Sequence, residues 1–301
     1  MPTVENRYRH IPAIHRLLDL PALRKAANQY GHSAVSEACR AAVDRLRRRV
    51  ADGEKPGDQA DDPGATLERE ILDALRAAGK PAYPALINAT GVLLHTNLGR
   101  APLRRELPPS LKSYLALEYN VTQGQRGQRL APLAKRIAAV CSAESAVMVN
   151  NNAAALFLML IAHARGREVV VSRGQLIEIG GSFRLPDVMS AAGATLVEVG
   201  CTNRTHLKDY AAAINENTAA ILVAHQSNFR IVGFTTTPTT RELAELAHAH
   251  GLPIYVDQGS GALHDLRRWD LPHEETIGEI LEAGADAVCF SGDTLLGGPQ
   301  A

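Results

Sequence analysis

Aromatic residues and long apolar runs are scarce in this 301-residue sequence. Phenylalanine, tryptophan and tyrosine make up 4% of it, which argues against a base-stacking surface of the kind that single-strand-binding proteins use. No apolar run reaches the roughly 20 residues that a membrane helix needs. The polar N-terminus lacks the apolar stretch of a signal peptide. We therefore expect a cytoplasmic protein with no membrane segment.

Cysteine is also rare, and acidic and basic residues balance. The cysteines lie far apart without the spacing of metal ligands, so we expect no metal site and reduced core thiols. The chain carries 32 basic and 32 acidic residues, and 46% of its residues are hydrophobic. This composition is typical of a globular protein with one large domain and a small one.

The neutral balance hides a basic N-terminal region. Residues 1–50 contain ten arginines and lysines against four acids. Ser33 is the predicted N-cap of a helix with apolar residues at helical spacing. The arginines Arg40, Arg45, Arg47, Arg48 and Arg49 spread around its later turns. They are either a solvated helix face or a surface that contacts RNA phosphates.

The region up to residue 80 is predicted to form a small helical domain. The composition of Gly53–Thr66 is typical of a linker. A second helix is expected from Thr66 to Ala78, where Gly79 and Pro81 end it. The large domain then occupies residues 81–301.

From Ile87 onward, short apolar runs alternate with amphipathic stretches. The predicted strands are Ala146–Val149, Glu168–Val171, Thr195–Val199, Ala219–Ala224, Pro253–Val256 and Ala287–Phe290. Helices are expected at Ala153–Ala164 and Thr240–His250. This alternation predicts an α/β fold with a mostly parallel sheet. Ligands of such sheets bind at the carboxyl ends of the strands.

Polar motifs follow several of these strands. Asn150–Ala155 joins a strand to a helix, where free backbone N–H groups attract an anion such as phosphate; it could equally be an ordinary capping turn. Asp257 ends another strand. Its carboxylate is suited to a pyridinium nitrogen, or else belongs to a solvent-facing turn. His225–Asn228 leaves a further strand end, and a histidine there could also be structural.

The segment Ser291–Ala301 follows the last predicted strand. A serine three residues before a lysine, placed after such a strand, is a recurring way to present a Schiff-base lysine to pyridoxal phosphate. Here the lysine position is held by Thr294. The motif therefore predicts a cofactor site whose covalent anchor is missing. An engineered change, a pseudogene lesion and a sequencing error would each put threonine at this position.

From about Ile11 to Ala301 the sequence resembles the bacterial selenocysteine synthases, the L-seryl-tRNA(Sec) selenium transferases. The segments that carry the resemblance are Asn88–Arg100, Val149–Ala155, Val171–Gly181, Thr202–His206, Asp257–Gly261 and Ser291–Gln300. Members of that family carry lysine where Thr294 stands. They also continue into a further C-terminal domain, before which this sequence stops.

The resemblance implies a pyridoxal-phosphate-dependent transferase of fold type I. The cofactor-binding residues that it implies are Asn151, Asn152, Ala153, Asn228, Asp257 and Ser291. The implied catalytic positions are Thr294, Arg100 and His225. Arg100 and Arg173 are candidates for binding an oxyanion such as selenophosphate, or for a salt bridge in a dimer interface. A homo-oligomer is also implied.

The implied reaction converts seryl-tRNA(Sec) into selenocysteinyl-tRNA(Sec) by β-replacement, with selenophosphate as the selenium donor and tRNA held by the N-terminal domain. Threonine has neither an amine nor useful basicity, so this chain is expected to be inactive or impaired. Two alternatives remain at this stage. One is a pyridoxal-phosphate-dependent lyase acting on a small amino acid or amino sugar, and the other is a non-catalytic tRNA-binding pseudoenzyme.

Overall fold

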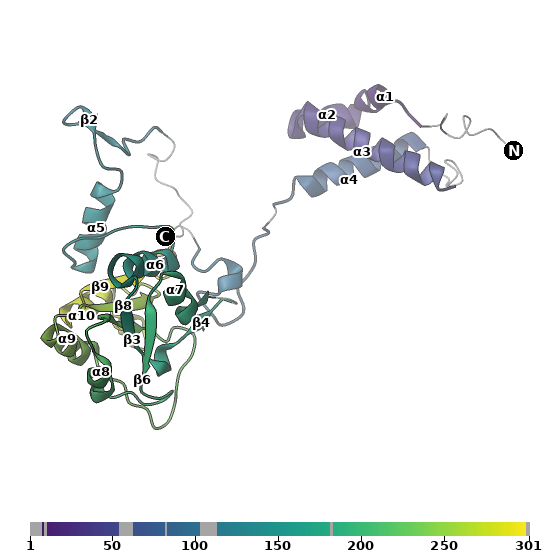
Figure 1. Cartoon of the computed structure of the whole chain (residues 1–301). Coiled ribbons are helices and arrows are strands. Elements are labelled where there is room, and N and C mark those ends of the chain that lie inside the picture. The colour runs from purple at the N-terminus through teal and green to yellow at the C-terminus, as the bar shows by residue number, and fades with distance from the viewer. Residues whose placement is uncertain are drawn as a thin grey trace. The chain divides into compact units, whose positions relative to one another are not determined.

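The computed structural model describes residues 8, 11–53, 63–81, 83–102, 113–180 and 183–298 (Figure 1). The chain forms two compact units, Met1–Ile87 and Asn88–Ala301. Most of the linker predicted at Gly53–Thr66 lies outside the described residues. No helix within the described ranges is long and apolar enough to cross a membrane.

The described part of the first unit contains four helices and no strand. These are α1 (Ile14–Leu18), α2 (Pro21–Tyr30), α3 (His32–Ala51) and α4 (Pro63–Ala78). Their apolar faces share one core, in which Leu23, Val35 and Ile71 are fully buried. Arg49 of α3 donates to Glu70 of α4 over 3.1 Å, which links the two longest helices. The small helical domain expected from the sequence is therefore present.

Helix α3 begins before the residue that was predicted to cap it. Its N-cap is Gly31, which has a φ of 89°. Because glycine alone adopts such an angle without strain, the chain turns there, directly after α2. Ser33 is therefore inside the first turn, and the prediction that it caps the helix was wrong.

The second unit contains a five-stranded sheet in the order β6-β3-β7-β8-β9. All neighbouring strands of this sheet run parallel. The strands are β3 (Glu168–Ser172), β6 (Thr195–Val199), β7 (Thr218–Ala224), β8 (Ile254–Gly259) and β9 (Ala287–Phe290). The predicted α/β class and parallel sheet are confirmed.

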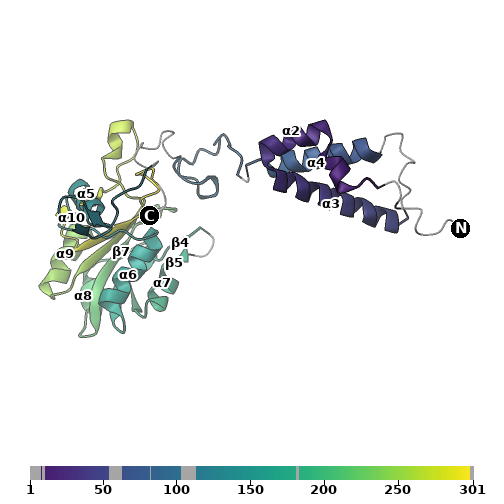
Figure 2. The ribbon, with the colours of Figure 1, turned by 90° about the horizontal axis from the view of Figure 1, so that it is seen from above.

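Helices cover both faces of this sheet (Figure 2). On one face, α6 (Asn152–Ala164) and α7 (Leu185–Ala191) bury Leu160 and Met189 against strand residues such as Val171 and Leu222. The other face carries α8 (Leu207–Ala213), α9 (Thr240–Ala249) and α10 (Ile277–Glu282). The second unit thus has three layers, helices, sheet and helices, with a hydrophobic core on each side of the sheet.

One predicted strand does not form. Ala146–Val149 is extended but pairs with no strand in the part of the chain that the structure describes, and the Val147 side chain is 78% exposed. An apolar run becomes a strand only where a neighbouring strand satisfies its backbone N–H and C=O groups. The run instead follows helix α5 (Ala131–Cys141).

Shorter elements complete the second unit. They are the antiparallel pairs β1 (Tyr119–Asn120) with β2 (Gln125–Arg126) and β4 (Glu178–Ile179) with β5 (Phe183–Arg184), and the 3-10 turns η2 (Thr96–Leu98), η4 (Arg173–Gln175) and η5 (Leu266–Trp269).

Candidate active site

The site forms where β7, β8 and β9 end and α6 begins. Strand β8 runs further than predicted, to Gly259, so Asp257 lies inside the strand. Asp257 pairs in register with Ala224 of β7 and Cys289 of β9. Its side chain is on the sheet face that α6 covers, because Asn152 of α6 reaches it.

Asp257 is a buried carboxyl group with donors built around it. It is 4% exposed. One carboxyl oxygen, Oδ1, accepts from Asn152 Nδ2 at 2.7 Å and from the Gly259 N–H at 3.2 Å. Burial raises the pKa of Asp257, and the bonds from Asn152 and Gly259 oppose that rise. A buried carboxylate of this kind gains free energy when a cationic group binds beside it.

The start of α6 presents backbone donors next to this carboxyl group. Asn151 is the N-cap, and its side chain accepts from the Ala154 N–H at 2.8 Å. The first N–H groups of a helix have no acceptor within the helix, so those of Asn152 and Ala153 are suited to an anion. The side chains of Asn151 and Asn152 are thus already bonded within the protein, and the backbone N–H groups are what remains for an anion.

The loop after β9 is bound to the loop after β8. The Ser291 N–H donates to the Gly259 carbonyl at 2.8 Å, and the Leu295 N–H donates to the Ser260 carbonyl at 3.2 Å. The Thr294 hydroxyl also donates to the Ser260 carbonyl. Gly261 permits this approach, since a Cβ there would lie 2.8 Å from the Ser291 carbonyl oxygen. Ser291 and Thr294 therefore lie at the same edge as Asp257.

His225 joins the site from the end of β7. Its backbone N–H donates to the Asp257 carbonyl at 2.9 Å. Its Nε2 lies 3.7 Å from a carboxylate oxygen of Glu274, which also accepts from the Ser260 hydroxyl at 2.7 Å. Glu274 is a site residue that the sequence did not reveal. It precedes α10 in an acidic pair that reads as an ordinary loop, and only the tertiary fold brings it to the strand ends.

The comparisons with known proteins now decide the family. The sequence profile of L-seryl-tRNA selenium transferase matches residues 86–301, and that of the selenocysteine synthase N terminus matches residues 8–47. This chain belongs to the L-seryl-tRNA selenium transferase family. The resemblance seen in the sequence motifs is confirmed.

Relatives in this family match the chain over nearly its whole length. The L-seryl-tRNA(Sec) selenium transferase of Pasteurella multocida is 45% identical over 298 residues, which are 98% of this chain and 65% of the relative. That of Carboxydothermus hydrogenoformans is 42% identical over 302 residues, 99% of this chain and 64% of the relative. The chain thus spans a little under two thirds of the length of these relatives.

A solved structure supports the fold class. The structure of D-glucosaminate-6-phosphate ammonia-lyase matches with a TM-score of 0.50 and 20% identity, covering 68% of this chain and 53% of that one. At this identity the match concerns the fold, which is the fold type I expected for the selenium transferase family.

The structure places three other predicted residues in bonds within the protein. The Asn228 amide donates to the Glu178 carbonyl at 2.7 Å. Arg173 binds Glu198 and the Gly200 carbonyl. Arg100 binds Asp293 at 2.8 Å, directly beside Thr294. Arg100 is therefore at the site, in an ion pair of its own subunit, whereas the amide of Asn228 is bonded to the β4 segment.

Several buried polar atoms at the carboxyl ends of β7, β8 and β9 lack a hydrogen-bond partner in the part of the chain that the structure describes. Asn152 Oδ1, His225 Nδ1 and Asp293 Oδ1 are buried and have no hydrogen-bond partner among the described residues. Buried polar groups normally have partners, so these atoms point to a polar ligand or water. Together with the α6 N-terminus and Asp257, they fit pyridoxal phosphate.

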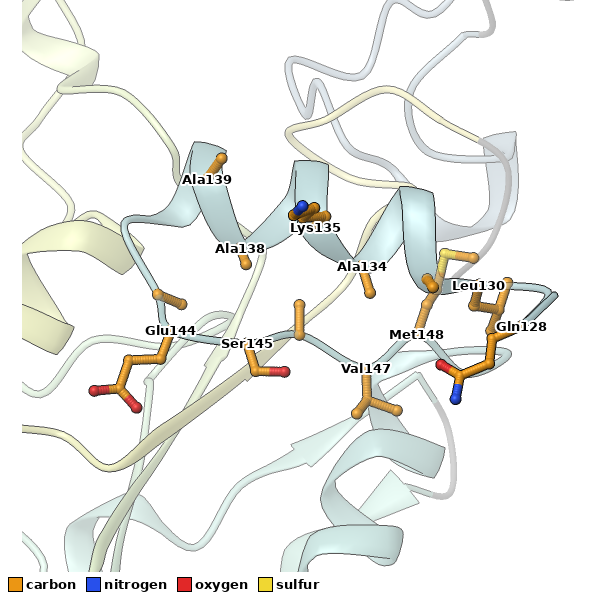
Figure 3. A pocket seen from close by; sticks show the side chains of 13 residues that line it. Gln128, Leu130, Ala134, Lys135, Ala138, Ala139, Glu144, Ser145, Val147 and Met148 are labelled. Carbon is orange, nitrogen blue, oxygen red and sulfur yellow. The ribbon is translucent and has the colours of Figure 1, made fainter. Parts of the chain in front are cut away.

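A groove elsewhere in the second unit does not belong to this site (Figure 3). It has a volume of about 620 Å³ and lies between α5 and residues 143–148, lined by side chains such as Lys135, Val147 and Met148. No residue predicted for the active site lines it. It is the space beside the predicted strand that did not form.

Proposed function

We propose that this chain is part of an enzyme that converts seryl-tRNA(Sec) into selenocysteinyl-tRNA(Sec). The observation that carries the proposal is the family match over residues 86–301, combined with Asp257 and the α6 N-terminus at one sheet edge. The cofactor is pyridoxal phosphate, and the selenium donor is selenophosphate. The enzyme acts in the cytoplasm as a homo-oligomer, with tRNA bound by the basic helical unit.

Each side chain at the edge has a defined task in this proposal. When bound, pyridoxal phosphate would supply an electron sink for the seryl α-carbon, so that its proton and the β-hydroxyl could be lost together as water before selenium adds. Asp257 holds a proton on the ring nitrogen, and the first turn of α6 holds the phosphate. His225, whose Nε2 lies 3.7 Å from Glu274, would hold a proton near the reacting group.

Thr294 is expected to prevent or strongly reduce catalysis by this chain. Its hydroxyl is bonded to the Ser260 carbonyl and offers no amine for covalent attachment. Catalysis by this chain should therefore be absent or strongly impaired. The threonine at position 294 also favours a second candidate function, that of a tRNA-binding pseudoenzyme.

Borohydride reduction tests the cofactor part of the proposal. The chain as written should bind pyridoxal phosphate without a covalent link, whereas Thr294→Lys should give an adduct at residue 294 after reduction and peptide mass mapping. Thr294→Arg is the matched control, because it brings positive charge without an attacking amine. An adduct at an active-site residue of the unaltered chain would contradict the role assigned to position 294.

Binding of tRNA separates the remaining candidates. Tight binding of tRNA(Sec) that weakens steeply with salt is expected for the synthase and for the pseudoenzyme. Indifference to tRNA would instead favour a lyase for small molecules. If Thr294→Lys restores selenocysteine formation on tRNA, the synthase is supported over the pseudoenzyme.

A further inference from the structure

Asn152 stands in the segment that should bind the cofactor phosphate, yet its side chain is directed at Asp257. Its amide nitrogen donates to Asp257 Oδ1 at 2.7 Å, the shorter of the two hydrogen bonds to that oxygen. It belongs to the first turn of α6, so its backbone N–H and its side chain face different partners. The two roles can therefore be separated by changing the side chain alone.

The charged form of the carboxyl group that receives this bond is stabilised most by Asn152, and then by the Gly259 N–H and the Cys289 side chain. Asp257 is buried, and its cross-strand neighbour Cys289 is buried as well. A hydrogen bond to a charged, buried group is stronger than one between neutral groups, and it also fixes the orientation of the carboxylate. The amide of Asn152 thus holds the Oδ1 oxygen of Asp257 in place.

The amide oxygen of Asn152 also bears on the orientation of this side chain. Asn152 Oδ1 is buried without a partner among the described residues. If the amide were turned around, this oxygen would face the carboxylate of Asp257, and two acceptors would oppose each other. The orientation with the nitrogen toward Asp257 is therefore the favourable one. In this orientation, Asn152 Oδ1 lies beside the carboxylate and can accept a hydrogen bond from a ligand.

We infer that Asn152 is a positioning residue for Asp257, and that its side chain acts on the ring nitrogen of the cofactor through that carboxylate rather than on the phosphate. This inference rests on the proposed function, in that Asp257 serves the ring nitrogen of pyridoxal phosphate. It assigns the phosphate to backbone N–H groups and the ring nitrogen to an Asn152–Asp257 pair.

Two cofactor forms distinguish the ring nitrogen from the phosphate. Pyridoxal phosphate carries both, whereas its carbocyclic analogue, with CH in place of the ring nitrogen, keeps only the phosphate. Binding of each is measured by equilibrium titration with the full chain, unaltered and as Asn152→Ala. Asn152→Ala should weaken pyridoxal phosphate binding about ten-fold or more and change analogue binding less than about two-fold.

An equal loss for both compounds would overturn the inference, because it would place the side chain on the phosphate or on the fold. Asn217→Ala, at an exposed position just before β7, is the matched control and should change neither affinity. Asn152→Leu keeps about the size of the side chain and adds no charge near the phosphate, but it removes the donor. It should show the same selective loss even if Asn152→Ala folds poorly.

The cofactor-free chain provides a test that does not need ligand binding. Thermal unfolding is compared for Asn152→Ala, Asp257→Asn and the double variant. Positioning of one residue by the other predicts that the shifts in Tm are not additive. Additive shifts would overturn the inference. If the unaltered chain binds neither compound, the proposed cofactor role fails, and this cycle still decides whether Asn152 acts on Asp257.

Discussion

At the scale of single residues, burial of the Asp257 carboxyl group is expected to lower the stability of the fold when the group is charged. Its pKa is raised chiefly by burial from an ordinary value of 3.8. As pH rises from that value to the folded pKa, the unfolded chain has lost a proton that the folded chain still binds. Stability therefore falls with rising pH across this window.

Asp257→Asn should remove that penalty. The cofactor-free variant is expected to unfold at a higher temperature than the unaltered chain at pH 7, and the gain should shrink toward pH 4. Each pKa unit corresponds to about 1.4 kcal/mol, and each kcal/mol to roughly 2–4 °C in a unit of this size. The same variant should bind pyridoxal phosphate less tightly.

Calorimetry from pH 4 to 8 provides the measurement. Asp270→Asn, at an exposed position, is the control and should follow the unaltered chain. Parallel profiles for Asp257→Asn and the unaltered chain would show that the buried carboxyl group does not oppose folding.

The cysteines give a second prediction at this scale. Cys201 is exposed, whereas Cys39, Cys141 and Cys289 are buried. Burial raises the pKa of each buried thiol, most strongly for Cys289, where the neighbouring Asp257 charge raises it further. Since the thiolate is the reactive form, a thiol reagent at neutral pH should label Cys201 rapidly and the others only after unfolding.

Mass mapping after a short pulse of alkylating reagent checks this order. Cys201→Ser should abolish the rapid phase. Rapid labelling of Cys289 in the folded chain would mean that the strand end at Asp257 opens to solvent far more readily than its burial implies.

At the scale of elements, helix α3 combines arginines in two different environments. Arg45 and Arg48 are exposed. Arg49 is only half-buried, but it donates to Glu70 of α4. Arg47 is paired with Asp44 one turn earlier on the exposed surface, where such pairs contribute little. The helix therefore has exposed arginines, which the proposed function assigns to RNA phosphates, and one arginine that joins two helices.

Replacement of exposed and bonded arginines should separate binding from stability. The triple change of Arg40, Arg45 and Arg48 to alanine is expected to weaken tRNA binding broadly, with the log–log salt slope reduced by up to about one unit for each lost phosphate contact. Arg49→Ala should mainly lower the unfolding temperature. Filter binding across salt concentrations, with calorimetry, measures both effects. An unaltered salt slope in the triple variant would leave these arginines as a solvated helix face.

At the scale of the whole molecule, each compact unit has a core of its own. The first unit buries residues of α1 to α4 together, and the cores of the second unit contain only residues beyond 150. The chain where the two units join is exposed to solvent: Tyr83 is 92% and Ile87 94% exposed. Few buried contacts therefore hold this stretch in place.

Chymotrypsin should cut this boundary after Leu86, because it cleaves after leucine and aromatic residues except where proline follows, as Pro84 follows Tyr83. The expected early products include a fragment that ends at Leu86 and its C-terminal complement. The helical fragment should keep its circular dichroism and cooperative unfolding. First cuts within α2 or β7 would contradict the presence of two independently stable units.

The sequence by itself determined the elements and the family. Short apolar runs predicted β6 and β9 to the residue, because burial on both faces of a parallel sheet imposes continuous apolar runs. The alternation of these runs with helical stretches predicted the parallel sheet as a class. The motifs around Asp257 and Ser291 identified the family, since they are long and specific.

Only the tertiary structure decided which of these residues meet. The strand expected at Ala146–Val149 lacks a partner in the described structure, and Glu274 reaches the site from a loop that no pattern marked. The bond from Asn152 to Asp257 joins residues 105 positions apart. Such contacts depend on how α6 packs on β8, and no local periodicity records them. The sequence thus specifies what each segment can form, and the packing of helices on the sheet decides which polar groups share a site.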